Sequence, residues 1–162
     1  MVFTVRATIL LCAVTAINLV LVPKASYAQE VDITPSSWSS SCLSTQVCEL
    51  KTEIVRNNSV VARVSIFRMR GYFWLQYTVP PGIDLIHGIS IAVDGDESTN
   101  TIISNCTNIG CTGHLDLTPR LISSMKSGSN LQLIFINPSN HDPLMIPFSL
   151  SGFTSGFDEL IQ

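Results

Sequence analysis

Apolar and polar residues alternate along the chain from position 48 onward, which is the pattern of a half-buried strand. Cys48, Leu50, Thr52 and Ile54 share one face, and charged residues stand between them. The same period returns over residues 60–66, which places Val60, Ala62, Val64 and Ile66 on one face. Asn57-Asn58 separates the two runs with residues that tolerate the positive φ angles of a tight turn. The pattern therefore predicts a β-hairpin over 48–66.

The rest of the chain repeats this design, with short apolar runs divided by Gly, Pro, Asn and Asp. Further strands are expected at 72–79, 89–93, 99–104, 112–117, 131–136 and 144–150. The strand at 99–104 is expected to pair back on 89–93 across the turn at Asp94–Glu97. Pro147 indicates that the last strand lies at a sheet edge or carries a bulge.

One helix is predicted after residue 118. Thr118 is a good N-cap, Pro119 suits the first helical position, and Gly128 suits the C-terminal cap. A second short helix is expected over 153–160. Strands every 8–15 residues with short turns predict an all-β fold, an antiparallel β-sandwich with one or two short helices.

The N-terminus has the order of a secretory signal peptide. Arg6 precedes an apolar run over 7–22, and small residues stand before a cleavage point after Ala28. We therefore expect residues 1–28 to be removed and residues 29–162 to form a single β-sandwich domain. The alternative is an uncleaved anchor, but 16 residues fall short of the roughly 20 that a membrane span needs.

Cleavage changes the charge balance of the chain. It removes two of the nine Lys and Arg residues and none of the 12 Asp and Glu residues, so the net charge falls to 7 − 12 = −5. This balance argues against nucleic acid as a partner, because phosphates require a basic surface. We expect no transmembrane span after cleavage, and a location in the periplasm, at the outer membrane or outside the cell.

Four cysteines remain once Cys12 is removed with the signal, and an even number in an exported chain predicts disulfides. The pairs Cys42–Cys48 and Cys106–Cys111 are favoured among three pairings, because each is close in sequence and flanked by turn formers. Each short loop is worth roughly 2–3 kcal/mol. The alternative is a zinc site, but the spacings do not match zinc ribbons, and we expect no metal.

The sequence contains no recognisable catalytic or cofactor motif. His87, His114 and His141 lie far apart without ligand spacing, and Asp94–Glu97 lacks the length and order of a calcium loop. We therefore expect no enzyme activity and no cofactor.

One set of residues suggests a binding face. Arg68, Arg70, Tyr72, Trp74 and Gln76 alternate, so an unbroken strand would place them on one side of a sheet. Cationic and aromatic side chains on a sheet can hold a sugar ring or a peptide. The alternatives are that Trp74 packs under a loop with the arginines simply solvated, and that Gly71 breaks the register.

The order of these segments resembles the invasion-associated locus B family of exported bacterial proteins. The matching stretches are Trp38 ahead of Cys42 and Cys48, Pro80–Ile83, Gly88–Asp94, Asn105-Cys106, Gly110-Cys111, Leu131–Phe135 and Phe148–Phe153. Pro81 departs from the family pattern in the detail of one turn. The resemblance implies a β-sandwich in the periplasm or outer membrane of an α-proteobacterium, and a link to virulence through invasion of red cells. It supplies no catalytic residues.

Together these observations predict a non-enzymatic envelope or surface binding module, with a protein or glycan partner in the envelope or on a host cell. One alternative is a periplasmic hydrolase, in which residues such as His114, Asp116 and Arg120 would converge in a cleft. A second alternative is a periplasmic stability factor or chaperone, which an exposed apolar patch or sheet edge would support.

Overall fold

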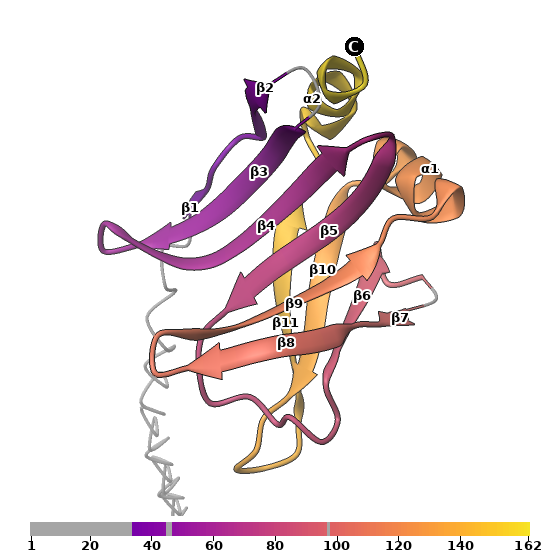
Figure 1. The fold of residues 1–162 in the computed structure, drawn as a ribbon. Coiled ribbons are helices and arrows are strands. Elements are labelled where there is room, and N and C mark those ends of the chain that lie inside the picture. Colours follow the sequence, from indigo (N-terminus) through magenta and orange to yellow (C-terminus); the bar gives the residue numbers. More distant parts are fainter. Residues whose placement is uncertain (1–33, 45–46, 97) are drawn as a thin grey trace, which may run out of the picture. The chain divides into compact units, whose positions relative to one another are not determined.

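The computed structural model describes residues 34–44, 47–96 and 98–162 (Figure 1). The predicted signal peptide, residues 1–28, lies outside the described residues and stays a prediction. The elements are β1 (Thr34–Pro35), β2 (Ser39–Ser44), β3 (Val47–Arg56), β4 (Ser59–Met69), β5 (Tyr72–Val79), β6 (Ile89–Val93), β7 (Thr99–Asn100), β8 (Ile102–Thr107), β9 (Gly110–Asp116), α1 (Pro119–Ser127), β10 (Asn130–Ile136), β11 (Pro143–Ser149) and α2 (Phe153–Leu160).

The strands form two antiparallel sheets, as the alternation predicts. The larger sheet has the order β1-β3-β4-β5-β9-β8, and β2 also pairs with β3. The smaller sheet has the order β11-β10-β6-β7 and lies behind the larger one in Figure 1. Pro147 is in β11, which is an edge strand, where the missing N–H of proline costs no ladder hydrogen bond.

The predicted hairpin over 48–66 is β3 and β4. Cys48, Leu50, Thr52 and Ile54 are buried on one face of β3, as expected. The turn is made by Asn57 and Asn58, whose φ angles are 50° and 59°. Val60 was expected on the buried face but is 46% exposed, because it lies beside this turn, where the β3–β4 register shifts between Ile54 and Val55.

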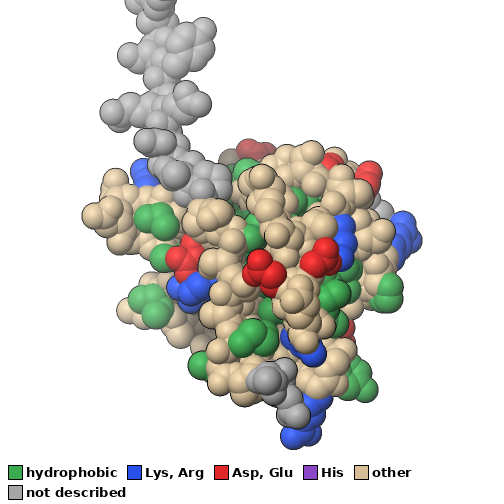
Figure 2. Space-filling model, turned by 90° about the horizontal axis from the view of Figure 1, so that it is seen from above, with side chains coloured by type: hydrophobic (Ala, Val, Ile, Leu, Met, Phe, Trp, Pro, Cys, Tyr) green, Lys and Arg blue, Asp and Glu red, His purple; other side chains and the backbone are tan. Residues whose placement is uncertain are grey.

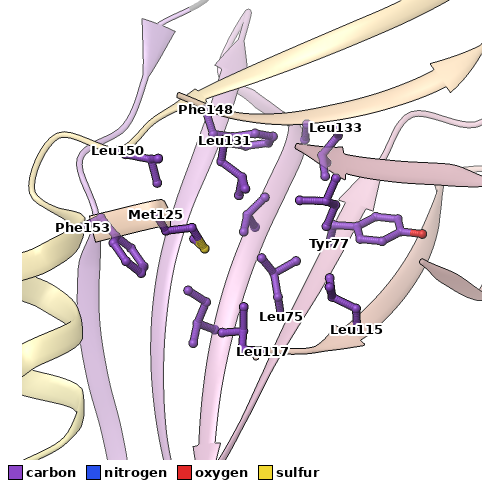
Figure 3. Close-up of a cluster of buried hydrophobic side chains, with 14 of the residues drawn as sticks. Leu75, Tyr77, Leu115, Leu117, Met125, Leu131, Leu133, Phe148, Leu150 and Phe153 are labelled. Atoms are coloured by element: carbon purple, nitrogen blue, oxygen red, sulfur yellow. The ribbon is translucent and has the colours of Figure 1, made fainter. Parts of the chain in front are cut away.

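The core fills the space between the two sheets (Figure 3). Leu75 and Tyr77 of the larger sheet meet Leu131 and Leu133 of the smaller sheet, and all four are at most 1% exposed. Each buried leucine contributes about 1.5–3 kcal/mol by leaving water. Both sheets are therefore held together through their inner faces.

Both helices form where the sequence predicts them. The Thr118 side chain accepts a hydrogen bond from the Leu121 amide at 3.2 Å and caps α1. Helix α2 begins at Phe153, which is fully buried, and its Gly156 lies against Leu50 of β3. A side chain at 156 would overlap Leu50, so glycine allows α2 to approach the sheet closely.

The prediction that residues 99–104 pair back on 89–93 was only partly right. Thr99 and Asn100 pair with β6, but the chain then crosses to the larger sheet, where β8 pairs with β9. Thr101 holds the crossing point, since its amide and its hydroxyl both donate to the Ile89 carbonyl, at 2.9 and 2.8 Å. The Tyr77 hydroxyl lies 2.7 Å from the same Thr101 oxygen. These polar contacts bind the two sheets together at this point.

The structure confirms both predicted disulfides, Cys42–Cys48 and Cys106–Cys111. Each joins directly opposed positions of two neighbouring strands, β2–β3 in the first case and β8–β9 in the second. Both therefore fasten an outer strand of the larger sheet to its neighbour. Within the described ranges, neither helix is long and apolar enough to cross a membrane.

Candidate binding face on the larger sheet

The five residues of the predicted face do not lie together. Tyr72, Trp74 and Gln76 alternate along β5 and point away from the core, whereas Leu75 and Tyr77 on the other face of the strand are buried. Arg70 lies in the turn before β5 with a φ of 53°, and Gly71 follows with a φ of 83°. Two successive positive φ angles reverse the chain. The strand is therefore interrupted, which is the alternative that Gly71 had left open.

Arg68 faces the opposite side from Trp74. It pairs with Phe73 of β5 and with Cys48 of β3, which lie toward the core. Its Nη1 donates a hydrogen bond of 2.6 Å to the Leu160 carbonyl at the end of α2. A guanidinium at a helix C-terminus meets carbonyls that lack a partner within the helix and the negative end of the helix dipole. The local position of Arg68 thus indicates a structural role in seating α2.

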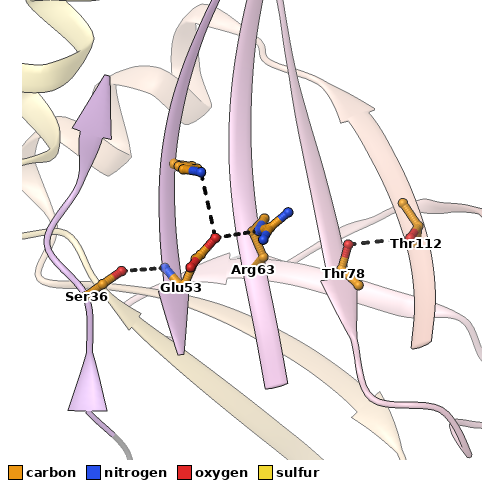
Figure 4. A network of polar contacts seen from close by, with 6 residues as sticks. Ser36, Glu53, Arg63, Thr78 and Thr112 are labelled. Atoms are coloured by element: carbon orange, nitrogen blue, oxygen red, sulfur yellow. Dashed lines mark hydrogen bonds and ion pairs between the residues drawn. The ribbon is translucent and has the colours of Figure 1, made fainter. Parts of the chain in front are cut away.

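The outer face of the larger sheet carries two contrasting rows of side chains. The first row crosses four strands through Glu53, Arg63, Thr78 and Thr112, which are register partners in turn. Arg63 Nε donates to Glu53 Oε1 at 2.7 Å (Figure 4). Lys51 Nζ lies 3.9 Å from the same oxygen. The Thr78 and Thr112 hydroxyls are 3.4 Å apart. The carboxylate of Glu53 is therefore paired with Arg63 inside the row and with Lys51 beside it.

The second row is Glu49, Phe67, Trp74 and Asp116, again register partners on β3, β4, β5 and β9. The Phe67 and Trp74 rings are stacked, with centroids 5.3 Å apart and planes inclined by 20°. We call these four residues the aromatic row. Two stacked rings therefore stand between two carboxylates on the outer surface of the sheet.

Polar side chains separate the two rows. Gln76 faces His114 across β5 and β9, and His114 Nδ1 lies 2.8 Å from the Ser104 hydroxyl. Met69 and Tyr72 lie on the other side of the aromatic row and are 45% and 78% exposed. The aromatic row therefore has apolar neighbours on one side and hydrogen-bonding neighbours on the other.

Two hollows open beside the aromatic row. A groove of about 690 Å³ runs between the start of β5 and α1, with Tyr72 and Ile122 among its walls. A second hollow of about 480 Å³ lies over Gln76 and His114. Trp74 and Asp116 line both.

Figure 2 looks down on the end of the fold that holds α1 and α2. Hydrophobic side chains emerge there in separate groups, with acidic and basic side chains between them.

The polar groups considered for a hydrolase do not converge. His114 and Asp116 share the second hollow, but Arg120 lines a different one, of about 410 Å³, with Asp96 and Thr118. His87 is also elsewhere, where its Nδ1 lies 2.7 Å from Asp84 Oδ2 and this hydrogen bond lowers the pKa of the Asp84 carboxyl. No group of three metal-ligating side chains occurs in the part of the chain that the structure describes.

Sequence reasoning missed two members of the aromatic row that flank Trp74. Phe67 falls on the outer face of β4 because the Arg70-Gly71 turn fixes the hairpin register. Asp116 was weighed only as a catalytic group, and its place opposite Trp74 depends on the pairing of β5 with β9, some 40 residues apart along the chain. The alternation of β4 was a usable signal for Phe67, but nothing local in the sequence indicated the Asp116 pairing.

Comparisons with known proteins agree with this architecture. Residues 38–161 match the family model described as "Invasion associated locus B (IalB) protein". Two curated proteins called invasion protein B homologs, from Brucella abortus strains 2308 and biovar 1 strain 9-941, are each 28% identical over 82 residues. That match spans about half of each protein, 51% of this chain and 47% of the relative.

A solved structure is similar over most of the fold. It is the crystal structure of invasion associated protein B from Bartonella henselae, with a TM-score of 0.68 and 26% identity. The alignment covers 79% of this chain and 94% of that one. The family model, the curated relatives and the solved structure thus agree with one another, and the chain belongs to the invasion-associated locus B family.

Proposed function

We propose that this protein is an exported, non-enzymatic binding module that engages a protein or glycan of the cell envelope or of a host-cell surface. The observation that carries the proposal is the aromatic row with its two flanking hollows on the outer face of the larger sheet. Trp and Tyr on an exposed face supply large contact areas at small entropic cost, as they do in many interfaces.

Export is supported by the disulfides and by the family. Cys42–Cys48 and Cys106–Cys111 are both formed in the structure, and such bonds persist in oxidising compartments. The predicted signal peptide and the family relationship point the same way. The periplasm, the outer membrane and the exterior are all consistent with these facts. Support for a role in invasion comes only from the names of the relatives.

A binding role is favoured over catalysis by the distribution of titratable groups. His114 contacts the Ser104 hydroxyl and shares a hollow with Asp116, and among the described residues no further acid, base or cation lines that hollow. General acid–base chemistry needs groups within hydrogen-bonding reach of one substrate atom. The surface instead offers aromatic area with polar groups around it.

Site-specific photo-crosslinking in intact cells tests the proposal. A photoreactive amino acid replaces Tyr72, which is 78% exposed beside the aromatic row, and in a separate variant it replaces Ile109, which is 85% exposed on the β8–β9 turn. We expect capture of a defined envelope or host-surface partner from position 72 and not from 109, and loss of capture when Trp74→Ala is added.

Fractionation and alkylation of the same cells test the location. The protein should be found outside the cytoplasm with Cys42, Cys48, Cys106 and Cys111 protected from alkylation. Equal capture from positions 72 and 109 would contradict the binding face. A cytoplasmic protein with freely alkylated cysteines would contradict export.

A further inference from the structure

The aromatic row has a chemistry that narrows the class of partner. We infer that it binds an extended segment of a partner protein that carries two arginines four positions apart, one guanidinium beside Asp116 and one beside Glu49. This inference rests on the proposed function, because it requires that the outer face of the larger sheet be a binding face. It adds the class of ligand and the direction in which that ligand crosses the sheet.

The first argument is charge. The carboxylates of Glu49 and Asp116 have no hydrogen-bond or ion-pair partner among the residues that the structure describes. Three nearby cations already have partners, since Arg63 and Lys51 contact Glu53, and Lys126 contacts Asp158 at 2.6 Å. The row therefore presents two negative charges that its own surface does not neutralise.

The second argument is the orientation of the rings. β5 lies between β4 and β9, so Trp74 has Phe67 on one side and Asp116 on the other. One indole face is stacked on Phe67, and the other face consequently turns toward the strand of Asp116. By the same reasoning, the free face of Phe67 turns toward β3, where Glu49 is its register partner.

Each end of the row thus combines an open aromatic face with a carboxylate. Side chains directly opposite in an antiparallel pair have Cβ atoms roughly 4.5–5.5 Å apart. A planar guanidinium between them can stack on the ring and form forked hydrogen bonds to the carboxylate at the same time. The ammonium of lysine lacks the planar fork, so arginine fits both features better.

The third argument is spacing. Glu49 and Asp116 are three strand intervals apart, about 14 Å at about 4.8 Å per interval, so two guanidiniums that lie between a ring and its carboxylate are about 10 Å apart. An extended chain advances about 3.3 Å per residue, so four residues span about 13 Å. Residues i and i+4 of an extended segment also point to the same side. A segment crossing the strands can therefore hold the backbone of arginines i and i+4 over the two ends of the row, and their long side chains reach inward by the remaining distance of about 3 Å to the two guanidinium positions.

The hollows beside the row supply room for the rest of the segment. The groove between β5 and α1 offers Tyr72 and Ile122 to apolar side chains, and the hollow over Gln76 and His114 offers hydrogen-bonding groups. Both open at the Asp116 end. Partner residues beyond the arginine at Asp116 are therefore expected to continue into one of them.

Calorimetry with the purified protein and synthetic peptides tests the inference. The probe is a short Gly/Ser/Thr peptide with arginines at i and i+4. Matched peptides carry lysine, citrulline or glutamate at those positions, or arginines at i and i+1. We expect the i,i+4 arginine peptide to bind best, with lysine weaker, and affinity to fall as salt concentration rises.

Variants of the row complete the test. Glu49→Gln and Asp116→Asn should each weaken binding of the arginine peptide about tenfold, the effect of losing one charged hydrogen bond. Asp142→Asn makes the same charge change on the β10–β11 connection of the smaller sheet and should leave affinity unchanged. Circular dichroism and thermal unfolding check that each variant is folded.

Several results would overturn the inference. They are no binding of the i,i+4 arginine peptide, equal binding of the citrulline peptide, an equal loss in Asp142→Asn, or binding of a neutral glycan in its place. If position 72 still captures a partner in cells, and if Trp74→Ala abolishes that capture, the proposed function stands and only the ligand class fails. If that capture also fails, the face itself is not a binding face.

Discussion

The ring of Tyr77 occupies the space that a side chain at position 113 would need. Tyr77 on β5 and Gly113 on β9 are register partners facing the core, and a Cβ built on Gly113 would overlap the Tyr77 hydroxyl and the Ile102 carbonyl. The absence of a side chain at 113 lets the phenol lie across β9 and reach Thr101 at the crossing between the sheets. The glycine and the tyrosine therefore form one structural unit.

We predict that Gly113→Ala destabilises the fold by about 1–3 kcal/mol, which is typical of overpacking in a core. The penalty is steric, because the added methyl must displace a fully buried ring and a backbone carbonyl. Chemical denaturation of both proteins measures the change in the free energy of unfolding. Thr112→Ala, one position away on the outer face, is the control and should cost much less. A fully stable Gly113→Ala protein would show that Tyr77 is not seated there.

We predict that Tyr77 makes the protein sensitive to alkali. Burial raises the pKa of the Tyr77 phenol above its ordinary value of 10.0. The unfolded chain then loses this proton at a lower pH than the folded protein, so stability falls as pH rises above 10 and through the raised pKa. Unfolding free energies measured from pH 8 to 12 should decline less steeply for Tyr77→Phe than for the unmodified protein.

The Tyr77→Phe variant should also be less stable at neutral pH, by about 1 kcal/mol, because the hydrogen bond with Thr101 is lost. Tyr72→Phe removes a phenol at an exposed position and is the control for both measurements. Parallel alkaline profiles for the unmodified protein and Tyr77→Phe would mean that another group governs the loss of stability.

We predict that each disulfide contributes about 2 kcal/mol, as expected for short loops. Replacing Cys106 and Cys111 together by alanine, or Cys42 and Cys48 together, should lower the free energy of unfolding by about that amount. Dithiothreitol should lower the Tm of the unmodified protein more than that of either double variant, since one bond remains to be reduced in each. If reduction leaves the Tm of the unmodified protein unchanged, neither disulfide stabilises the fold.

We predict that Arg68→Ala loosens α2. The guanidinium donates to the Leu160 carbonyl at the helix end, and loss of a hydrogen bond from a charged group costs about 1.5–3 kcal/mol. Arg70→Ala, two residues away in the exposed turn, should change stability by less than about 0.5 kcal/mol. Hydrogen exchange should show faster exchange of α2 amides in Arg68→Ala only. Equal effects of the two substitutions would indicate that the Arg68 contact is not retained in solution.

Local patterns of the sequence were sufficient for much of the fold. Alternation placed the hairpin of β3 and β4, the capping residues placed α1, and the short spacings of the cysteines gave the two disulfides. These features depend on interactions between residues close together in the chain, so a short stretch of sequence contains everything needed to predict them.

Only the tertiary structure decided which side chains meet on the outer face. The Arg70-Gly71 turn put Arg68 on the inner side and Phe67 beside Trp74, and the pairing of β5 with β9 brought Asp116 to the other side of Trp74. Likewise, the chain passes from the smaller sheet to the larger one at Thr101, although alternation alone favoured continued pairing with β6. Alternation fixes two faces for every strand but not which strands are neighbours or in what register. That choice depends on packing and hydrogen bonds summed over residues far apart in the chain.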